Sequence, residues 1–393
     1  MSDTTPQTAP ATRQAWGAVG SMSMCVSLLI ASEFMPVSLL TPIADDLQAT
    51  AGMAGQAISI SGLFAVITSL LIADLTSSHD RRHVLLGLTV TMLLSLMLIA
   101  VAPNFTVLMA ARALLGVTIG GFWALSTATI MRLVPASSLP KALGVLYTGN
   151  AVAVAFAAPI GSYFGGLIGW RGVFWAMVPL VVANLAWQWV SLPSMPSTKR
   201  TQKSNVFALL KRRHVAFAMV AVMLSFAGAF STFTYLRPFL EIRAGVDAAQ
   251  LSLLLLALGM AGFIGTYGAS RLLGRHLYRL LAGLPLALAI ATLALLIFGY
   301  QLWPAAFVLI GWGALNAAIP VAWSTWLSQG ISDNPEAGGG LMVAAIQLAI
   351  MAGAAFGGLL LDHVSLTSTW IGGAGLLLLA TLVVGRGQRL KIA

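Results

Sequence analysis

Charged side chains are scarce in this sequence. Asp, Glu, Lys and Arg together supply 8% of its 393 residues, against about 25% in an ordinary soluble domain. Hydrophobic residues supply 59%, and a soluble fold of this length has no means of burying so much apolar surface. The scarcity of charge therefore excludes a soluble enzyme and indicates an integral membrane protein with little mass outside the bilayer.

Cysteine and acidic residues are also few. The single cysteine, Cys25, lies in an apolar run, so an internal disulfide is excluded. With 11 acidic against 21 basic residues the formal net charge is +10, which in a soluble protein would raise the question of nucleic acid. Here the basic residues mostly lie in short loops between apolar segments, and that is an orientation signal of membrane proteins. We expect no nucleic-acid partner.

Several chemical motifs are missing as well. The sequence has no Gly-x-x-x-x-Gly-Lys phosphate loop, so we do not expect ATP to drive the protein directly. His79 and His83 are four residues apart, but they lie in a loop with no third ligand, which makes a weak metal site. We find neither a nucleophile with its base nor a filter-like ring of residues at membrane depth. We therefore expect no enzyme, no channel, no cofactor and no metal.

What the sequence does contain is a series of apolar segments of about 20 residues, the length that spans a bilayer as a helix. The sequence predicts an all-α fold with twelve such spans. We place them at 17–40, 53–75, 83–102, 105–131, 141–167, 172–192, 215–239, 250–270, 280–300, 304–329, 338–361 and 369–385.

Basic residues predict the orientation of these spans. With the N-terminus in the cytoplasm, all but four of the 21 Lys and Arg residues fall on the cytoplasmic side, as membrane insertion favours. The exceptions are Arg112, Arg171, Arg237 and Arg243. Both termini are then cytoplasmic.

The longest internal polar stretch divides the chain nearly in half. We expect a disordered cytoplasmic tail at 1–16, a six-helix bundle at 17–192 and a basic cytoplasmic linker at 193–214. A second six-helix bundle at 215–385 and a cytoplasmic tail at 386–393 complete the chain. The linker is basic enough to lie on anionic lipid.

The two halves share short sequence elements at corresponding places. The strings "EFMPV" from Glu33 and "YLRPF" from Tyr235 each carry a proline three residues after their first residue, in spans 1 and 7. The string "FGGL" occurs at Phe164 and again at Phe356, near the ends of spans 5 and 11. Matches at corresponding places indicate an internal duplication, and duplicated halves around a midplane site are typical of secondary transporters.

Ionisable residues inside the spans are the strongest candidates for function, because each costs several kcal/mol in hydrocarbon. Glu33 is the one acid that we place well within a span. Burial penalises its charged form and a nearby cation would favour it, so this carboxyl is a candidate proton carrier; the alternative is a purely structural glutamate. Arg112 in span 4 has a similar depth and needs an acid, a carbonyl or water as partner. Arg237 lies near the outer end of span 7, where reaching the interface explains it equally well.

Uncharged polar and aromatic residues in the spans form a second group of candidates. Helix contacts explain each amide or ring at least as well as ligand binding does, but the set together would suit a flat polar ligand that stacks and accepts hydrogen bonds. The predicted substrate-binding residues, besides Glu33 and Arg237, are Phe34, Phe122, Trp123, Asn150, Phe230, Tyr235, Asn316, Trp323 and Gln347.

Three motifs give the chain a resemblance to the major facilitator superfamily, and within it to the twelve-span drug–proton antiporters. The loop after span 2 reads "ADLTSSHDRRHVLL", in which Arg81 and Arg82 match the family signature while Ser77 and Asp80 depart from it. Span 4 contains "RALLG", an Arg four residues before a Gly. Span 5 contains "APIGSYFGG", which keeps Pro159 and Gly161 of the antiporter signature.

The resemblance implies functions for these residues. It implies that Arg112 takes part in proton transfer and that Asp80, Arg81 and Arg82 belong to a gating loop. Longer strings such as "GGFWALSTATIMRLVP" and "SFAGAFSTFTYLRP" are similar to bacterial exporters of purine ribonucleosides. We therefore expect a monomeric, proton-coupled antiporter of the bacterial inner membrane, surrounded by lipid, that exports a nucleoside-like small molecule. A broad-specificity drug or sugar exporter of the same superfamily is the alternative.

Overall fold

The computed structural model is entirely helical in the part of the chain that it describes, which is residues 13–76, 78–135, 138–196, 206–331 and 335–385 with Gly387 and Leu390. Residues 1–12 of the predicted tail, 197–205 of the predicted linker and most of 386–393 therefore lie outside the described residues, whereas residues 13–16 already belong to the first helix.

Helices α1 to α6 come from the first half of the chain. They are α1 (Arg13–Ser38), α2 (Leu40–Asp46), α3 (Ala51–Leu75), α4 (Arg81–Val101), α5 (Phe105–Leu133) and α6 (Leu139–Ser191). A short 3₁₀ turn (Val206–Lys211) precedes the second half. Its helices are α7 (Arg213–Phe233), α8 (Leu236–Ala244), α9 (Ala248–Phe298), α10 (Leu302–Gly330), α11 (Pro335–His363) and α12 (Leu366–Val384).

Helix starts follow local capping chemistry. The side chain of Asn104 accepts a hydrogen bond from the backbone N–H of Val107, and Asp247 and Ser365 form capping boxes at the starts of α9 and α12. Such residues satisfy the N–H groups that the first helical turn leaves without partners.

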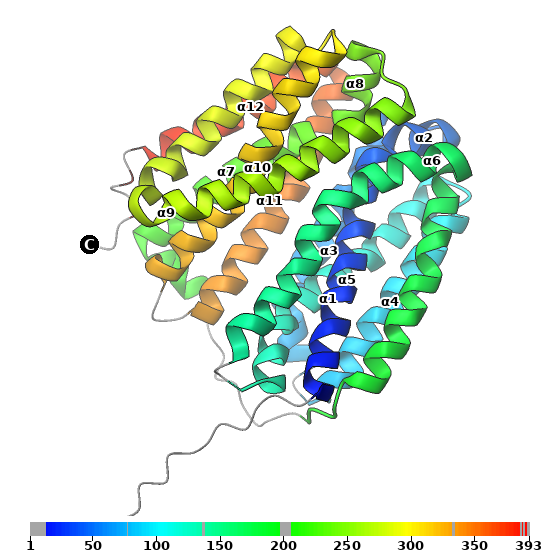
Figure 1. The fold of residues 1–393 in the computed structure, drawn as a ribbon, viewed down its shortest axis with the longest axis vertical. Helices are drawn as coiled ribbons and strands as arrows, with labels where there is room; N and C mark the ends of the chain where they lie inside the picture. Colours follow the sequence, from blue (N-terminus) through cyan, green and yellow to red (C-terminus); the bar gives the residue numbers. More distant parts are fainter. Residues whose placement is uncertain are drawn as a thin grey trace, which may run out of the picture.

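Helices α6 and α9 each consist of two helical segments joined at a reversal of the chain. The 53-residue α6 is interrupted at Gly169, whose φ of +73° lies in the left-handed region that glycine adopts without strain. The 51-residue α9 is interrupted at His276, with φ −133° and ψ 26°. In Figure 1 the ribbon doubles back in both α6 and α9. Every predicted span overlaps one of these helices or helix halves.

The expected spans 1 (17–40) and 7 (215–239) each contain a helix break near their end. Helix α1 ends at Ser38 and α2 begins at Leu40, while α7 ends at Phe233 and α8 begins at Leu236. Pro36 lacks the N–H that a continuing helix needs, and Pro238 lies in the first turn of α8, where a missing N–H costs nothing. The "EFMPV" and "YLRPF" strings therefore mark a matched pair of helix breaks.

The helices form two bundles that lie side by side (Figure 1), an N bundle of α1–α6 and a C bundle of α7–α12. Each has its own buried core: one cluster is drawn from residues between Ala15 and Met195, and the other mainly from residues between Leu209 and Leu390. The few N-bundle residues that join the second cluster belong to the end of α1, to α2, to the start of α3 and to α6. The two cores therefore merge at the end of the molecule that carries α2 and α8.

Among the described residues, eleven helical segments are long and apolar enough to cross a membrane, and one of them is the 51-residue segment Lys141–Ser191. Exposed large hydrophobic side chains cover them, for example Leu382 at 71% and Phe307 at 81% exposure. An exposed apolar surface of this extent suits lipid as the surrounding solvent. The protein is a multi-pass membrane protein.

Candidate functional site

Glu33 lies in the last two turns of α1, where α1 faces both its own bundle and the other one. The side chain is 3% exposed. Its carboxylate oxygen Oε1 is 3.5 Å from Nε2 of Gln347, a long hydrogen bond from α11 of the C bundle. The acid predicted from the sequence therefore lies at the contact between the two bundles.

Arg112 is fully buried in α5 beside Glu33. Its guanidinium donates to the backbone oxygens of Ala57 (3.0 Å), Ser32 (2.8 Å) and Glu33 (3.3 Å) and to the hydroxyl of Ser61 (2.9 Å). These acceptors belong to α1 and α3, so one cation joins three helices of the N bundle. Arg112 and Glu33 are thus in contact, although the hydrogen bond reaches the backbone oxygen of Glu33 and not its carboxylate.

Aromatic rings next to Glu33 also meet across the two bundles. The ring of Phe34 lies 5.7 Å from that of Phe230 and 6.3 Å from that of Phe233, centroid to centroid. These are distances at which aromatic pairs attract. Glu33, Phe34, Phe230 and Gln347, all four predicted as substrate-binding, therefore come together at one place.

A second aromatic pair lies on the N bundle. Trp123 of α5 stacks on Tyr147 of α6 at 5.8 Å and 27°, and Tyr147 is 51% exposed. Asn150 follows three residues later on α6 and is half-buried. The sequence analysis missed Tyr147; its spacing of three residues from Asn150, on one helical face, is the signal that could have found it.

Other predicted substrate-binding residues lie inside the bundles. Phe122 is completely buried in the core of the N bundle, and Trp323 is 1% exposed in the core of the C bundle next to Trp326. Packing accounts for both side chains, and their substrate contacts stay a prediction. Asn316 in α10 is half-buried.

Tyr235 and Arg237 lie at the end of the molecule that carries α2 and α8, where the two helix breaks meet. The hydroxyl of Tyr235 donates to the backbone oxygen of Ala354 at 2.8 Å. Arg237 pairs with Glu241 at 2.8 Å and donates to the backbone oxygen of Ser38 in the N bundle. Glu241 in turn accepts from the hydroxyl of Thr41 at 2.6 Å. Arg237 is thus 8% exposed and occupied by protein partners, so the interface-snorkelling interpretation is wrong.

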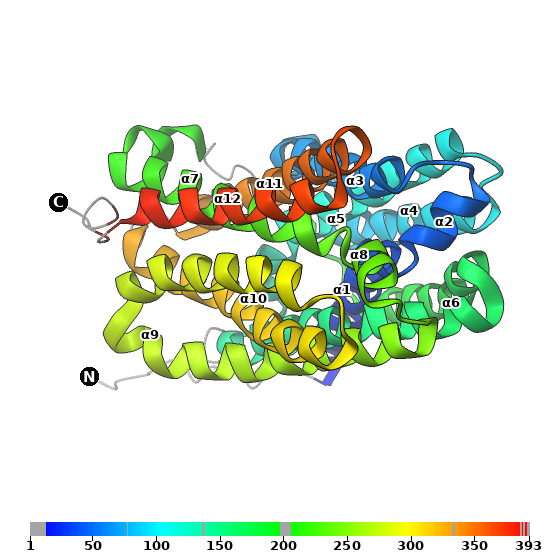
Figure 2. The same ribbon diagram turned by 90° about the horizontal axis from the view of Figure 1, so that it is seen from above.

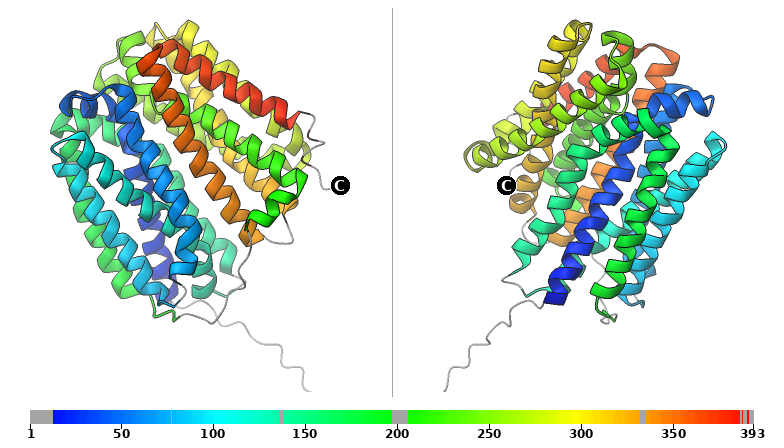
Figure 3. Two further views of the ribbon diagram at one scale, coloured as in Figure 1. Left: turned by 180° about the vertical axis from the view of Figure 1, so that it is seen from behind. Right: turned by 45° about the vertical axis from the view of Figure 1, so that its right-hand side comes forward.

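A further contact closes the same end. The carboxylate of Asp362, at the end of α11, accepts from the backbone N–H of Gly52 (3.1 Å) and from the hydroxyl of Thr50 (2.5 Å). Asp362 therefore caps the N-terminus of α3 from the other bundle. Figure 3 shows the bundles converging at the end that carries α2 and diverging toward the start of α1.

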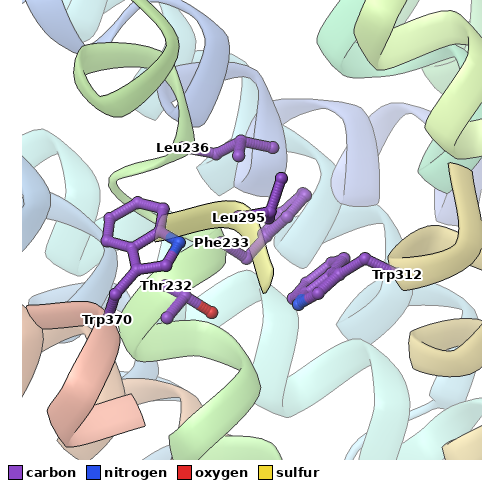
Figure 4. Close-up of a pocket in the computed structure, with 6 residues that line it drawn as sticks. All are labelled: Thr232, Phe233, Leu236, Leu295, Trp312 and Trp370. Carbon is purple, nitrogen blue, oxygen red and sulfur yellow. The ribbon is translucent and has the colours of Figure 1, made fainter. Parts of the chain in front are cut away.

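The C bundle also encloses a small apolar pocket beside the α7–α8 break (Figure 4). Phe233, Leu236, Leu295, Trp312 and Trp370 are among its lining residues. Its volume is about 10 Å³, which is roughly the space of one water molecule. A nucleoside-sized ligand does not fit there. Among the described residues, no group of three or more His, Cys, Asp or Glu side chains lies close enough to hold a metal ion.

Comparison with known proteins identifies the family. The Major Facilitator Superfamily model matches residues 22–342 of this chain. The chain belongs to the Major Facilitator Superfamily. It is therefore a membrane transporter and not an enzyme.

Two kinds of relative are similar over nearly the full length. The Transcription regulatory protein OpdE of Pseudomonas aeruginosa is 48% identical over 374 residues, which cover 94% of this chain and 92% of OpdE. The Purine ribonucleoside efflux pump NepI of Salmonella typhimurium is 43% identical over 378 residues, which cover 96% of this chain and 95% of NepI. The NepI of Salmonella paratyphi B has the same identity and coverage.

The loop that matches the superfamily signature connects α3 to α4 and is held within the N bundle. Asp80 caps α4 through the N–H of Arg82 and also accepts from the hydroxyl of Ser194 (2.5 Å) and the N–H of Met195 (2.9 Å). Burial opposes the charged form of Asp80, but these hydrogen bonds outweigh it and hold the pKa of the carboxyl below its usual range.

The two arginines of this loop contact the same region. Arg81 donates from its side chain to the hydroxyl of Thr76 at 3.1 Å, and its backbone N–H bonds to Met195. Arg82 donates to the backbone oxygen of Trp189 at 2.6 Å and lies over the Trp189 ring. The loop thus fastens the start of α4 to the end of α6; Ser77 lies outside the described residues. The function of this α3–α4 loop as a gate stays a prediction.

Pro159 and Gly161, which we predicted to belong to an antiporter motif, lie in the first half of α6. A Cβ atom at Gly161 would lie 2.6 Å from Oγ of Ser38 and 2.7 Å from the side chain of Met35. Glycine therefore allows α6 to approach the end of α1, directly after Glu33. A Cβ atom at Gly165, in the first "FGGL", would contact Leu39 just after α1. A Cβ atom at Gly357, in the second "FGGL", would contact Ser231 and Tyr235 at the end of α7. The two glycines thus occupy corresponding places in the two bundles, which agrees with an internal duplication.

Proposed function

We propose that this protein is a proton-coupled antiporter that exports purine ribonucleosides or close analogues across a bacterial inner membrane by alternating access. The observation that carries the proposal is the position of Glu33: a buried carboxyl at the contact between the bundles, bonded to Gln347 of one bundle and adjacent to Arg112 of the other.

The topology that we infer has twelve spans, with both termini in the cytoplasm and a single chain as the working unit. A straight α6 of 53 residues would be about 80 Å long at 1.5 Å per residue, far beyond the roughly 30 Å of the bilayer core. The reversal at Gly169 divides α6 into two segments that each suit one crossing. With α9 divided at His276, the two bundles then have six crossings each.

The contacts between the bundles support an arrangement closed on the outside. Thr41, Arg237 and Asp362 all bond across the bundles at the end that carries α2 and α8. This end faces outward in the proposed topology. Substrate would then reach Glu33 from the cytoplasmic side, along the face that carries Trp123 and Tyr147.

The coupling that we propose uses one carboxyl for two ligands. In the outward-facing arrangement Glu33 takes up a proton and loses its contact with substrate; in the inward-facing arrangement it releases the proton to the cytoplasm. Arg112 favours the charged form of the Glu33 carboxyl. Its guanidinium is held in place by backbone oxygens, which do not titrate, so its position does not depend on the protonation of Glu33. Exchange of one proton for a neutral nucleoside would move one charge, worth about 2.3 kcal/mol per 100 mV.

The substrate class rests on chemistry and on relatives. Phe34, Phe230 and the Trp123–Tyr147 pair supply stacking surfaces, and Gln347 and Asn150 supply amides. A purine base needs both. The printed name of NepI describes purine ribonucleoside efflux, whereas that of OpdE describes transcription regulation, which a chain with eleven candidate spans does not support.

The test is Glu33→Gln in proteoliposomes loaded with radiolabelled inosine. We expect uphill, pH-driven transport to vanish while inosine–inosine exchange persists, because the amide keeps the shape but does not carry a proton. Asp247→Asn, at the exposed start of α9, is the matched control and should transport normally. Undiminished pH-driven transport by Glu33→Gln would refute the coupling. Transport of arabinose or a hydrophobic cation by the parent protein, without transport of inosine, would refute the substrate class.

A further inference from the structure

A cavity of about 510 Å³ lies at the end of the C bundle that carries the C-terminus. It is formed between α9, just after its break at His276, and the last turn of α12. Figure 2 shows that α12 ends on the side of the molecule where the C-terminus lies. Arg279, Gly283 and Leu286 line it from α9, and Thr381 and Gly385 line it from the other side. The volume is in the range of about 300–1,000 Å³ that small-molecule sites occupy.

The walls of this cavity are held in place by the fold. The hydroxyl of Thr381 donates to the backbone oxygen of Ala282 at 3.2 Å, which ties α12 to α9. Gly385 and Gly387 have φ values of +52° and +74°, so the chain turns directly after α12. Leu390 is fully buried, and its backbone oxygen accepts from the indole N–H of Trp326 at 3.1 Å. Thr381 and Gly385 therefore have fixed positions in the cavity wall.

The surface outward from the cavity is apolar. Leu286 is 39% exposed, and Ile290 (60%) and Ile297 (71%) continue the same face of α9 at helical spacing. Leu382 of α12, 71% exposed, lies one residue after Thr381. In a membrane protein this stripe contacts acyl chains, so the cavity opens where hydrocarbon meets the polar region of the bilayer.

The charge at the cavity is positive. Arg279 is exposed, and among the described residues it makes no ion pair with a carboxylate. A guanidinium recognises a phosphate with two parallel hydrogen bonds, and basic pockets between membrane helices are sites for anionic head groups.

We propose that this cavity binds an anionic phospholipid, with the phosphate at Arg279 and the acyl chains along the Leu286–Ile297 stripe of α9. The inference is independent of the substrate and of the coupling proposed above, because none of the residues at the α1–α11 contact takes part in it.

The experiment uses the full chain purified in detergent, with bound lipid counted by native mass spectrometry. The probes are phosphatidylglycerol, phosphatidylcholine and inorganic phosphate. We expect phosphatidylglycerol to bind more tightly than phosphatidylcholine, and Arg279→Ala to weaken phosphatidylglycerol binding about fivefold, the factor that corresponds to about 1 kcal/mol per basic side chain. Arg271→Ala is the control, since Arg271 is also an exposed α9 cation but stacks on Tyr267 at 4.5 Å.

A second variant tests the cavity without touching the charge. A Cβ atom at Gly283 meets no atom within 4 Å. Gly283→Leu therefore adds a side chain to the cavity wall without overlap at Cβ and should weaken phosphatidylglycerol binding while Arg279 remains. Gly268→Leu, on the same helix and equally unobstructed, should bind lipid like the parent. Four results would each overturn the proposal. Phosphatidylglycerol and phosphatidylcholine could bind equally well, or Arg279→Ala and Arg271→Ala could lose phosphatidylglycerol binding equally. Gly283→Leu could bind phosphatidylglycerol like the parent, or inorganic phosphate alone could compete with the lipid.

Discussion

At the scale of single residues, the buried cation Arg112 is satisfied by oxygens that carry no charge. Three backbone carbonyls and one hydroxyl accept from it, so its cost of burial is met by hydrogen bonds to two neighbouring helices, α1 and α3. Removing the guanidinium would leave these carbonyl oxygens without a donor in an apolar environment.

We therefore predict that Arg112→Met lowers the stability of the N bundle by at least about 1–3 kcal/mol, the cost of leaving a buried acceptor without a donor. Thermal denaturation followed by size-exclusion chromatography measures this loss. Ser61→Ala removes a single acceptor and should cost less, about 1 kcal/mol. An Arg112→Met variant as stable as the parent would contradict the structural function of these bonds.

Asp80 carries a pH dependence whose sign follows from its surroundings. Its pKa is lower in the folded protein than the usual value of about 3.9, so its contacts stabilise the fold above that value. The contribution is lost as the pH falls from about 4 through the lower folded pKa.

We predict that hydrogen exchange at residues 192–196 rises as the pH falls through this window, since Ser194 and Met195 lose a charged acceptor. In Asp80→Asn the same exchange, corrected for intrinsic rates, should not change with pH in that window. A parent-like acid response of the Asn variant would assign the effect to another group.

At the scale of whole helices, close approach decides the packing of α1 on α6. The hydroxyls of Ser23 and Ser27 donate to the backbone oxygens of Val145 (2.6 Å) and Gly149 (2.9 Å). A Cβ atom at Gly149 would overlap the backbone oxygen of Ser23. Such contact without side chains between the helices is a known way for membrane helices to associate.

Gly149→Ala should accordingly destabilise the protein by about 1–3 kcal/mol, the cost of overpacking. Gly144, five residues earlier on the same helix, has open space at its Cβ position, so Gly144→Ala should be neutral or stabilising by up to about 1 kcal/mol. Melting temperatures of the two variants, measured side by side, check this; equal effects would contradict the assigned contact.

At the scale of the whole molecule, the two bundles are joined by polar contacts at the end that carries α2 and α8. Asp362 of the C bundle caps α3 of the N bundle, and Thr41 and Arg237 bond across the helix breaks. These contacts have to separate if the bundles are to open on that side, so their strength sets the balance between the two arrangements.

Asp362→Ala should shift the population toward the outward-open arrangement. Spin labels at Met53 and Val364, both exposed, in a Cys25→Ala background would report a longer distance in the variant. His363→Ala, the neighbouring residue, is the control and should leave the distance distribution unchanged. Identical distributions for Asp362→Ala and the parent would show that this cap does not hold the outer end closed.

Much of the fold could be predicted from the sequence because hydropathy is a local property of the chain. Each apolar segment became a helix near its predicted limits, and Glu33 and Arg112 stood out as ionisable residues in such segments. The helix breaks after Ser38 and Phe233 were missed, although Pro36 and Pro238 marked them, because a proline near a helix end either kinks a helix or begins a new one.

The sequence alone determined the class of the protein, the positions of its apolar helices and the residues that violate their composition. Only the tertiary structure decided what those residues face: Gln347 and Phe230 across the bundles for Glu33 and Phe34, protein partners for Arg237, and the bundle cores for Phe122 and Trp323. The physical reason is that hydrophobicity acts along the chain, whereas the partner of a side chain depends on the rotation of its helix and on which distant helix packs against it.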